Sequence, residues 1–218
     1  MAGIYSVLNG HLAYGAYFIF AAAVLDFLDG FVARLLKAYS EIGKQLDSLA
    51  DLVTFGVLPA FIIFTLLQDI YPRSYLPILA FFIATQSAIR LAKFNIDTRQ
   101  TDRFIGVPTP ANALMLSTLP FMAEKFNWME GLIQNGIFLL AFSLCFALLL
   151  TAELPLIALK FKNFSLKDNI YRYLVLFLSL ICLLTMGVGG IPLAILTYVV
   201  LSVVENLGQR HAKADKPI

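Results

Sequence analysis

The sequence predicts an all-α fold, a polytopic bundle of about seven transmembrane helices. Of its 218 residues, 60% are hydrophobic and 14% are charged, and its mean hydropathy is +0.81. Soluble domains contain about 45–50% apolar and about 25% charged residues, so lipid is expected to cover much of this chain. Several apolar runs approach the roughly 20 residues that a spanning helix needs, and they lack the alternation of membrane strands.

Proline and glycine mark most of the boundaries between the predicted spans. Tyr71-Pro72-Arg73 separates the second span from the third, Gly106-Val-Pro-Thr-Pro110 opens the fourth, and the glycines at 187–190 predict a tight turn. Pro155 is expected to kink or end the fifth helix. The predicted spans are 12–37, 45–68, 75–95, 108–125, 132–158, 170–187 and 190–207. We therefore predict a single transmembrane domain over residues 1–208 and a polar cytoplasmic tail over residues 209–218.

The lysines and arginines of the connections predict the orientation, because such residues collect on the cytoplasmic side. Of the 16, 14 fall on one side of the predicted bundle, and only Arg73 and Lys125 fall on the other. The larger group is predicted to be cytoplasmic; it comprises Arg34, Lys37, Lys44, Arg90, Lys93, Arg99, Arg103, Lys160, Lys162, Lys167, Arg172, Arg210, Lys213 and Lys216.

Seven spans with a cytoplasmic C-terminus place Met1 outside, although nothing before the first span would drive its translocation. One further N-terminal helix is therefore expected to be missing from this sequence. The net charge of only +2 gives no reason to expect a nucleic-acid partner. Cys145 and Cys182 lie inside apolar runs and are expected to be core thiols.

One segment combines several charged residues with glycines between strongly apolar neighbours. It runs from Asp26 to Asp51 and also contains Asp29 and Asp47. Asp26 and Asp29 lie about 60° apart on one helix face, and Asp47 and Asp51 stack one turn apart on the next helix. A short elbow around residues 39–43 would bring the two pairs of carboxylates together at the cytoplasmic end of the bundle.

Four carboxylates so close together repel one another unless cations join them. Oxygen ligands without a nearby histidine or cysteine favour Mg²⁺ or Mn²⁺, with Ca²⁺ as a further candidate occupant, over zinc. Two such ions would balance the four negative charges and leave room for a pyrophosphate. Arg34 would bind phosphate, and the small residues Gly30 and Ala33 would let a ligand approach the helix. These residues predict a divalent-metal site for phosphoryl chemistry.

Other interpretations of the same residues remain open. Aspartate and arginine at helix ends are often interfacial caps, and a face of small residues is often only a packing surface. An ion or proton pathway, as in an ion-coupled membrane transporter, would instead spread acidic groups through the depth of the membrane.

The segment also resembles a known family. Residues Asp26 to Asp51 fit the pattern D-x₂-D-G-x₂-A-R-x₈-G-x₃-D-x₃-D of the CDP-alcohol phosphotransferases at every specified position. The resemblance implies transfer of a phosphatidyl group from a CDP-activated lipid to an alcohol, with release of CMP. It also implies a bacterial cytoplasmic-membrane protein, often a homodimer, whose active site faces the cytoplasm.

Family roles can be carried over to the matching positions. The resemblance implies that Asp26, Asp29 and Asp47 bind the metal pair and that Asp51 contributes to it. Asp51 would also be the general base, so that Asp47 and Asp51 are the expected catalytic residues. The residues expected to line the nucleotide and its phosphates are Asp29, Gly30, Ala33, Arg34 and Gly43.

The choice of acceptor alcohol depends on segments downstream. Three of them resemble the bacterial phosphatidylserine synthases of the family: Leu46-Asp-Ser-Leu-Ala-Asp51 continuing into Phe55-Gly-Val-Leu-Pro-Ala60, then Arg90-Leu-Ala-Lys-Phe-Asn95, and then Gly106-Val-Pro-Thr-Pro110. The implied substrates are CDP-diacylglycerol and L-serine. Arg90 and Lys93 are expected to pair with the serine carboxylate and Asn95 to add a hydrogen bond, unless the two cations only anchor the helix end. Glycerol 3-phosphate and an inositol phosphate remain alternative acceptors.

Overall fold

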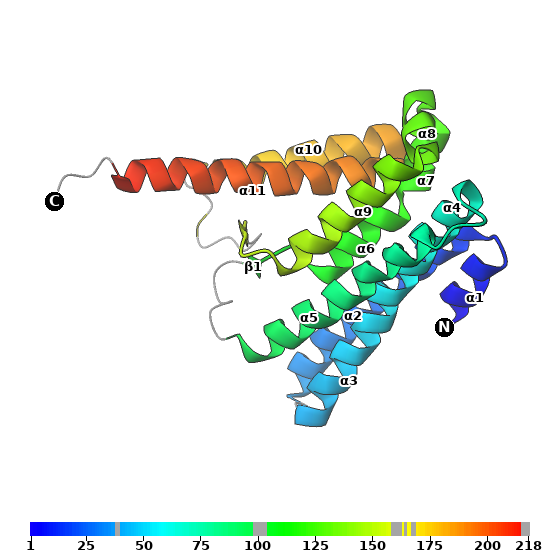
Figure 1. The fold of residues 1–218 in the computed structure, drawn as a ribbon. Helices are drawn as coiled ribbons and strands as arrows, with labels where there is room; N and C mark the ends of the chain where they lie inside the picture. The colour runs from blue at the N-terminus through cyan, green and yellow to red at the C-terminus, as the bar shows by residue number, and fades with distance from the viewer. Residues whose placement is uncertain (38–39, 98–103, 158–162, 164, 167–168, 215–218) are drawn as a thin grey trace.

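The computed structural model describes residues 1–37, 40–97, 104–157, 163, 165–166 and 169–214 (Figure 1). The helices and strands in this part of the chain, in order, are α1 (Ala2–Leu8), α2 (Leu12–Leu36), α3 (Glu41–Asp51), the π-helix η1 (Leu52–Val57), α4 (Leu58–Ile70), the 3₁₀-helix η2 (Leu76–Phe81), α5 (Phe82–Ile96), β1 (Phe104–Ile105), α6 (Thr109–Ser117), α7 (Leu119–Lys125), α8 (Asn127–Gln134), α9 (Gly136–Thr151), β2 (Pro155–Leu156), α10 (Ile170–Met186), the 3₁₀-helix η3 (Gly187–Gly190) and α11 (Ile191–Ala214).

Long apolar helices dominate the fold, as predicted. Within the described residues, four helical segments are long and apolar enough to cross a membrane: Leu12–Leu36, Glu41–Ile70, Leu76–Ile96 and Ile170–Gly208. A fifth is added if α8 and α9, which meet at an angle of 85°, form one broken span. These helices fit an integral membrane protein.

The predicted count of seven spans is not confirmed. The predicted span 108–125 is divided at Thr118 into α6 and α7, and each is much shorter than the roughly 20 residues that a spanning helix needs. The predicted span 132–158 was too long, because α9 ends at Thr151 and the chain at Pro155 is extended. Residues 170–208 form one of these four apolar segments. This segment contains two helices, α10 and α11, which pack side by side (Figure 1).

Two further differences lie near the ends of the chain. The sequence pattern did not predict α1, which packs against α2 and α4 and buries Gly3 and Val7. Helix α11 continues to Ala214, into the segment predicted as a polar tail.

Two clusters of buried side chains hold the helices that carry the acidic segment. The larger cluster joins α4, α5, α6, α7, α8 and α9, and it includes Ile63, Ile83 and Leu116. The second joins α1, α2, η1, α4 and α6 through residues such as Ile19 and Phe55. Helices α2 and α4 are therefore fixed against the rest of the bundle, while the end of α2 and all of α3 project beyond it (Figure 1).

A short antiparallel ladder joins the segment before α6 to the segment after α9. In it, Phe104 pairs with Leu156 and Ile105 with Pro155. Helix α11 fastens this ladder through side-chain hydrogen bonds: the Tyr198 hydroxyl donates to the backbone oxygen of Ile157 at 3.0 Å, and the Ser202 hydroxyl accepts from the Ile157 N–H at 3.2 Å. The ladder in turn sets the path of the chain into α6.

Gly106 makes the turn between β1 and α6. Its φ is +76°, and a Cβ at this position would collide with the backbone oxygen of Leu150. Its N–H donates to the backbone oxygen of Leu154 at 2.9 Å. Only glycine fits this combination of left-handed backbone and close approach.

We expect Gly106→Ala to lower the thermal stability of the protein in detergent. Left-handed strain alone costs about 1–3 kcal/mol, and the collision with Leu150 adds to it. The control is Gly131→Ala in α8, where a Cβ meets nothing within 4 Å and alanine favours the helix. Melting temperatures of the two variants check this; an equal effect of both substitutions would contradict it.

Candidate functional site

Three of the four predicted carboxylates lie together. Asp26 comes from α2, and Asp47 and Asp51 come from α3. Each offers a carboxylate oxygen, and these oxygens all lie within 4.8 Å of one another. Asp26 and Asp51 are half-buried, whereas Asp47 is exposed. The predicted meeting of the two helices is therefore confirmed for these three residues.

Asp29 lies at the edge of this group. It is exposed and outside the set of three, but it is close enough to Asp26, Asp47 and Asp51 for mutual electrostatic repulsion. It lies on the turn of α2 that follows Asp26, toward solvent. The arrangement is thus three clustered carboxylates with a fourth beside them.

Local signals bring α2 and α3 into this hairpin. Helix α2 ends at Leu36 and is followed by Lys37, whose φ of 52° is left-handed. The Ser40 hydroxyl caps α3 by accepting a hydrogen bond from the Gly43 N–H at 3.0 Å. Helix α3 begins at Glu41, so the predicted span starting at residue 45 and the elbow reaching Gly43 were placed too late. Tyr39, which the predicted elbow includes, lies outside the described residues.

A π-helix follows directly after Asp51. Segment η1 (Leu52–Val57) packs against α5, and Gly56 permits the contact: a Cβ there would lie 2.9 Å from the Ser87 Cβ. π-Helical turns often occur at functional sites. This one joins the acidic end of the helix to its apolar continuation, α4.

The donor set suits a hard divalent cation. Three carboxylate oxygens at this separation match the ligands that Mg²⁺ and Mn²⁺ prefer, and this set contains no nitrogen or sulfur ligand. The mutual repulsion of the carboxylates is relieved when a cation binds between them. Asp26, Asp47 and Asp51 therefore form a cluster that can bind a divalent metal ion.

The residues predicted to contact a nucleotide lie on the same two helices. A Cβ on Gly30 would meet nothing within 4 Å, so open space adjoins this half-buried position. Ala33 is also half-buried, and Arg34 is exposed in the last turn of α2. Gly43 has a structural role as well, since a Cβ there would lie 2.8 Å from the Ser40 hydroxyl that caps α3.

Arg90 of α5 approaches the acidic cluster from another side. Its side chain is buried, with 8% exposed, and its Nε has no hydrogen-bond partner. It interacts electrostatically with Asp51 and Tyr198, and its guanidinium carbon lies 5.9 Å from the centre of the Phe94 ring. An arginine that only anchors a helix end would extend its charged group into solvent. Because the Arg90 side chain is buried, it does not have that role alone.

Lys93 and Asn95 differ from Arg90. Lys93 is exposed in the last turn of α5. Asn95 ties α5 to α3: its side-chain amide donates to the Ser48 hydroxyl at 2.9 Å, and its backbone oxygen accepts from Lys44 Nζ at 2.9 Å. Asn95 therefore supports the position of the helix that carries Asp47 and Asp51.

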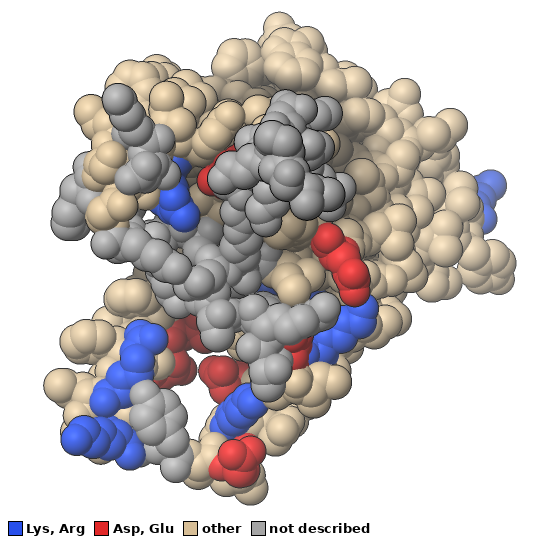
Figure 2. Space-filling model, turned by 90° about the vertical axis from the view of Figure 1, so that its left-hand side faces the viewer, with Lys and Arg blue, Asp and Glu red and all other residues tan. Residues whose placement is uncertain are grey.

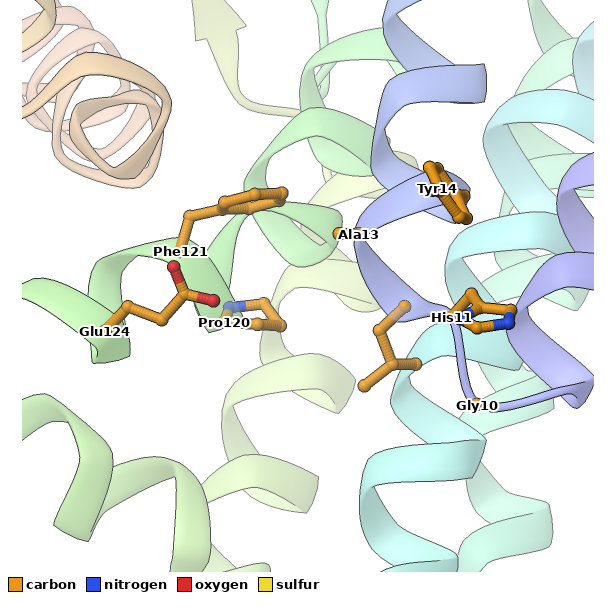
Figure 3. Close-up of a pocket in the computed structure, with 8 residues that line it drawn as sticks. Gly10, His11, Ala13, Tyr14, Pro120, Phe121 and Glu124 are labelled. Carbon is orange, nitrogen blue, oxygen red and sulfur yellow. The ribbon is translucent and has the colours of Figure 1, made fainter.

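The acidic side chains are accessible from outside. Figure 2 shows acidic side chains in a hollow on the face that includes this end of the molecule, with lysine and arginine side chains around it. A separate cavity of about 470 Å³ lies at the other end of α2, lined by residues of the α1–α2 turn and α7 such as His11, Tyr14 and Glu124 (Figure 3). It contains none of the predicted site residues.

The sequence patterns did not identify two polar residues on α5 and α6, the helices that pack against η1. Ser87 on α5 and Asn112 on α6 are fully buried, and their side-chain polar atoms lack hydrogen-bond partners. The only signal in the sequence was a polar residue inside each predicted apolar span.

Comparisons with known proteins identify the family of this chain. The sequence profile described as CDP-alcohol phosphatidyltransferase matches residues 1–159, which include the acidic cluster and Arg90. Three similar proteins are each called CDP-diacylglycerol–serine O-phosphatidyltransferase. The one from Helicobacter pylori is 31% identical over 183 residues, 83% of this chain and 75% of its own length. The one from Bacillus subtilis is 38% identical over 122 residues, which are 56% of this chain and 68% of its own length. The one from Mycobacterium tuberculosis is 36% identical over 145 residues, which are 63% of this chain and 49% of its own length.

The profile covers well over half of the chain and includes the whole acidic hairpin. The hairpin brings together Asp26, Asp47 and Asp51, which are among the residues on which the resemblance in the sequence was based. This chain belongs to the CDP-alcohol phosphatidyltransferase family.

Proposed function

We propose that this protein transfers the phosphatidyl group of CDP-diacylglycerol to the hydroxyl of L-serine, giving phosphatidylserine and CMP. The observation that carries the proposal is the meeting of three carboxylates from α2 and α3 with the buried Arg90 near Asp51. The first arrangement suits a pyrophosphate donor and the second an acceptor that carries a carboxylate. The names of the relatives support serine as that acceptor.

On the donor side, we propose that Asp26, Asp29, Asp47 and Asp51 hold two divalent ions, Mg²⁺ or Mn²⁺. When bound, such ions polarise the phosphoryl group and neutralise charge on the leaving CMP. The exposed Arg34 contacts phosphate. The open space beside Gly30 admits the nucleotide, which Ala33 and Gly43 also line.

On the acceptor side, Asp51 acts as the general base. Its carboxylate takes the proton of the serine hydroxyl, and the hydroxyl oxygen attacks the β-phosphorus that carries the lipid. A P–O bond forms to serine, and the bond from that phosphorus to the oxygen of CMP breaks. Arg90 pairs with the serine carboxylate; the exposed Lys93 guides it in, and Asn95 holds α5 against α3.

The site is proposed to face the cytoplasm of a bacterial cell, where serine and CDP-lipid head groups are available. Arg34, Lys44 and Lys93 lie on the helix ends that form the site, whereas Arg73 and Lys125 lie on the α4–η2 turn and at the end of α7. That distribution follows the positive-inside rule. The homodimer expected from the family stays a prediction.

We expect Asp47→Asn and Asp51→Asn each to reduce serine-dependent CMP release by about 100-fold or more, the scale of removing a general base or a metal-bound group. Glu41→Gln is the matched control, since Glu41 is an exposed acid on the same helix outside the cluster. Initial rates with CDP-diacylglycerol and L-serine in mixed micelles provide the measurement. Full activity of either aspartate variant would contradict the proposed site.

Removal of divalent metal is expected to abolish the reaction, because the clustered carboxylates then repel one another and the pyrophosphate. Activity after exhaustive chelation should return on titration with Mg²⁺ or Mn²⁺, and Ca²⁺ is tested as a competing occupant. Undiminished CMP release from the chelated protein would refute the metal assignment.

Arg90→Ala is expected to raise the KM for L-serine by about 10- to 100-fold, the scale of a lost hydrogen bond to a charged group, with little change in the KM for CDP-diacylglycerol. Arg73→Ala, an exposed arginine outside the site, is the control. Steady-state kinetics with each substrate varied in turn separate the two constants. An unchanged KM for serine would remove Arg90 from the acceptor site.

A further inference from the structure

Three described residues have buried side-chain polar atoms without a hydrogen-bond partner. They are Ser87 (Oγ), Arg90 (Nε) and Asn112 (both Nδ2 and Oδ1). The large majority of buried polar atoms in proteins are hydrogen-bonded, and leaving one unpaired is unfavourable. A group of such atoms in neighbouring helices is therefore a candidate site for a bound molecule that provides the missing partners.

Ser87 lies close to the reaction centre. It is three residues before Arg90 on α5, so both side chains point to the same helix face. A Cβ on Gly56 would lie 3.2 Å from the Ser87 hydroxyl and 3.0 Å from Leu52 Cδ1. Leu52 directly follows Asp51, so the Ser87 hydroxyl lies against the π-helix that begins at the proposed general base.

Asn112 lies on the next helix that packs against the same segment. Helix α6 contacts η1, α5 and α11, and the Asn112 side chain has 0% of its surface exposed. Its amide offers a donor and an acceptor, and both lack partners. The neighbouring Ala113 packs in the cluster that contains Phe55 of η1.

We propose that the side-chain oxygens of Asn112 and Ser87 bind the ammonium group of the amino-acid acceptor. This proposal rests on the proposed function and deepens it. A serine molecule presents a hydroxyl, a carboxylate and an ammonium group. The first is assigned to Asp51 and the second to Arg90. An ammonium group has three donors and no acceptor, so it is repelled by Arg90 and needs uncharged or anionic oxygens, which Asn112 and Ser87 supply.

Acceptor analogues separate this role from a structural one. L-Serine, 3-hydroxypropanoate (which lacks the ammonium group) and ethanolamine (which lacks the carboxylate) are compared as substrates or as competitive inhibitors of serine turnover. Asn112→Leu removes both polar atoms and keeps an apolar side chain of similar size, and Ser87→Ala removes one hydroxyl.

Both variants are expected to weaken binding of L-serine and ethanolamine, by about 10- to 100-fold for Asn112→Leu, while leaving 3-hydroxypropanoate and the KM for CDP-diacylglycerol nearly unchanged. Arg90→Ala should show the converse pattern and leave ethanolamine nearly unchanged. The control is Ser117→Ala on α6, because Ser117 is also buried but its hydroxyl donates to its own helix at Leu114.

The outcomes are distinguishable. Equal losses for all three acceptors, or a change in melting temperature without a change in acceptor discrimination, would mean that these atoms bind only an ordered water, and would overturn the proposal. If Asn112→Leu does not fold, Ser87→Ala decides by the same pattern. Absence of serine-dependent CMP release by the unmodified protein would instead refute the proposed function itself.

Discussion

The mutual repulsion of Asp26, Asp47 and Asp51 is the constraint on which the rest of this structure depends. Their carboxylate oxygens lie within 4.8 Å of one another at the end of a largely apolar bundle, where unpaired charges are unfavourable. Such proximity must be enforced by the fold. The Ser40 cap starts α3, and the Asn95–Ser48 and Lys44–Asn95 hydrogen bonds tie it to α5. Helix α4, which continues the same helical segment, is anchored in both buried clusters. A cation bound between the carboxylates would relieve this repulsion and attract an anionic substrate.

The position of the cluster along the helices matters as much as its composition. Asp47 is exposed, and Asp26 and Asp51 are only half-buried, so water-soluble molecules reach them. Several large apolar side chains of α2 are exposed in the turns around Asp26, among them Leu25, Phe27 and Phe31. One helix therefore presents carboxylates to the site and hydrocarbon to the bilayer. This combination suits a substrate with a charged head and lipid tails.

The metal-binding cluster could be predicted from the sequence because its residues lie in one short segment, and the reaction class followed from the resemblance of that segment to a known family. Helical spacing places Asp26 on one helix and Asp47 and Asp51 on the next, and a hairpin can join them in only one way. The span count could not be predicted, because hydropathy does not reveal the break at Thr118 or the bend between α8 and α9. Helix α1 was missed because its buried side, Gly3 and Val7, is too small to give a periodic pattern. Ser87 and Asn112 were missed because a single polar residue in an apolar span has no pattern at all, and only packing shows that it lacks a partner.

Asp51 is the point at which the two halves of the site meet. It is the last residue of α3, which also carries Asp47. The π-helix that follows has about one more residue per turn than the α-helices on either side of it. Gly56 within that segment lets α5 approach closely enough to bring Ser87 against it, and one turn further along α5 is Arg90. The residues proposed to bind the CDP-lipid therefore belong to α2 and α3, while the unpartnered polar atoms belong to α5 and α6. If those atoms bind the acceptor, then the helices behind the π-helix determine which alcohol is used, and the acidic hairpin remains the same for every acceptor.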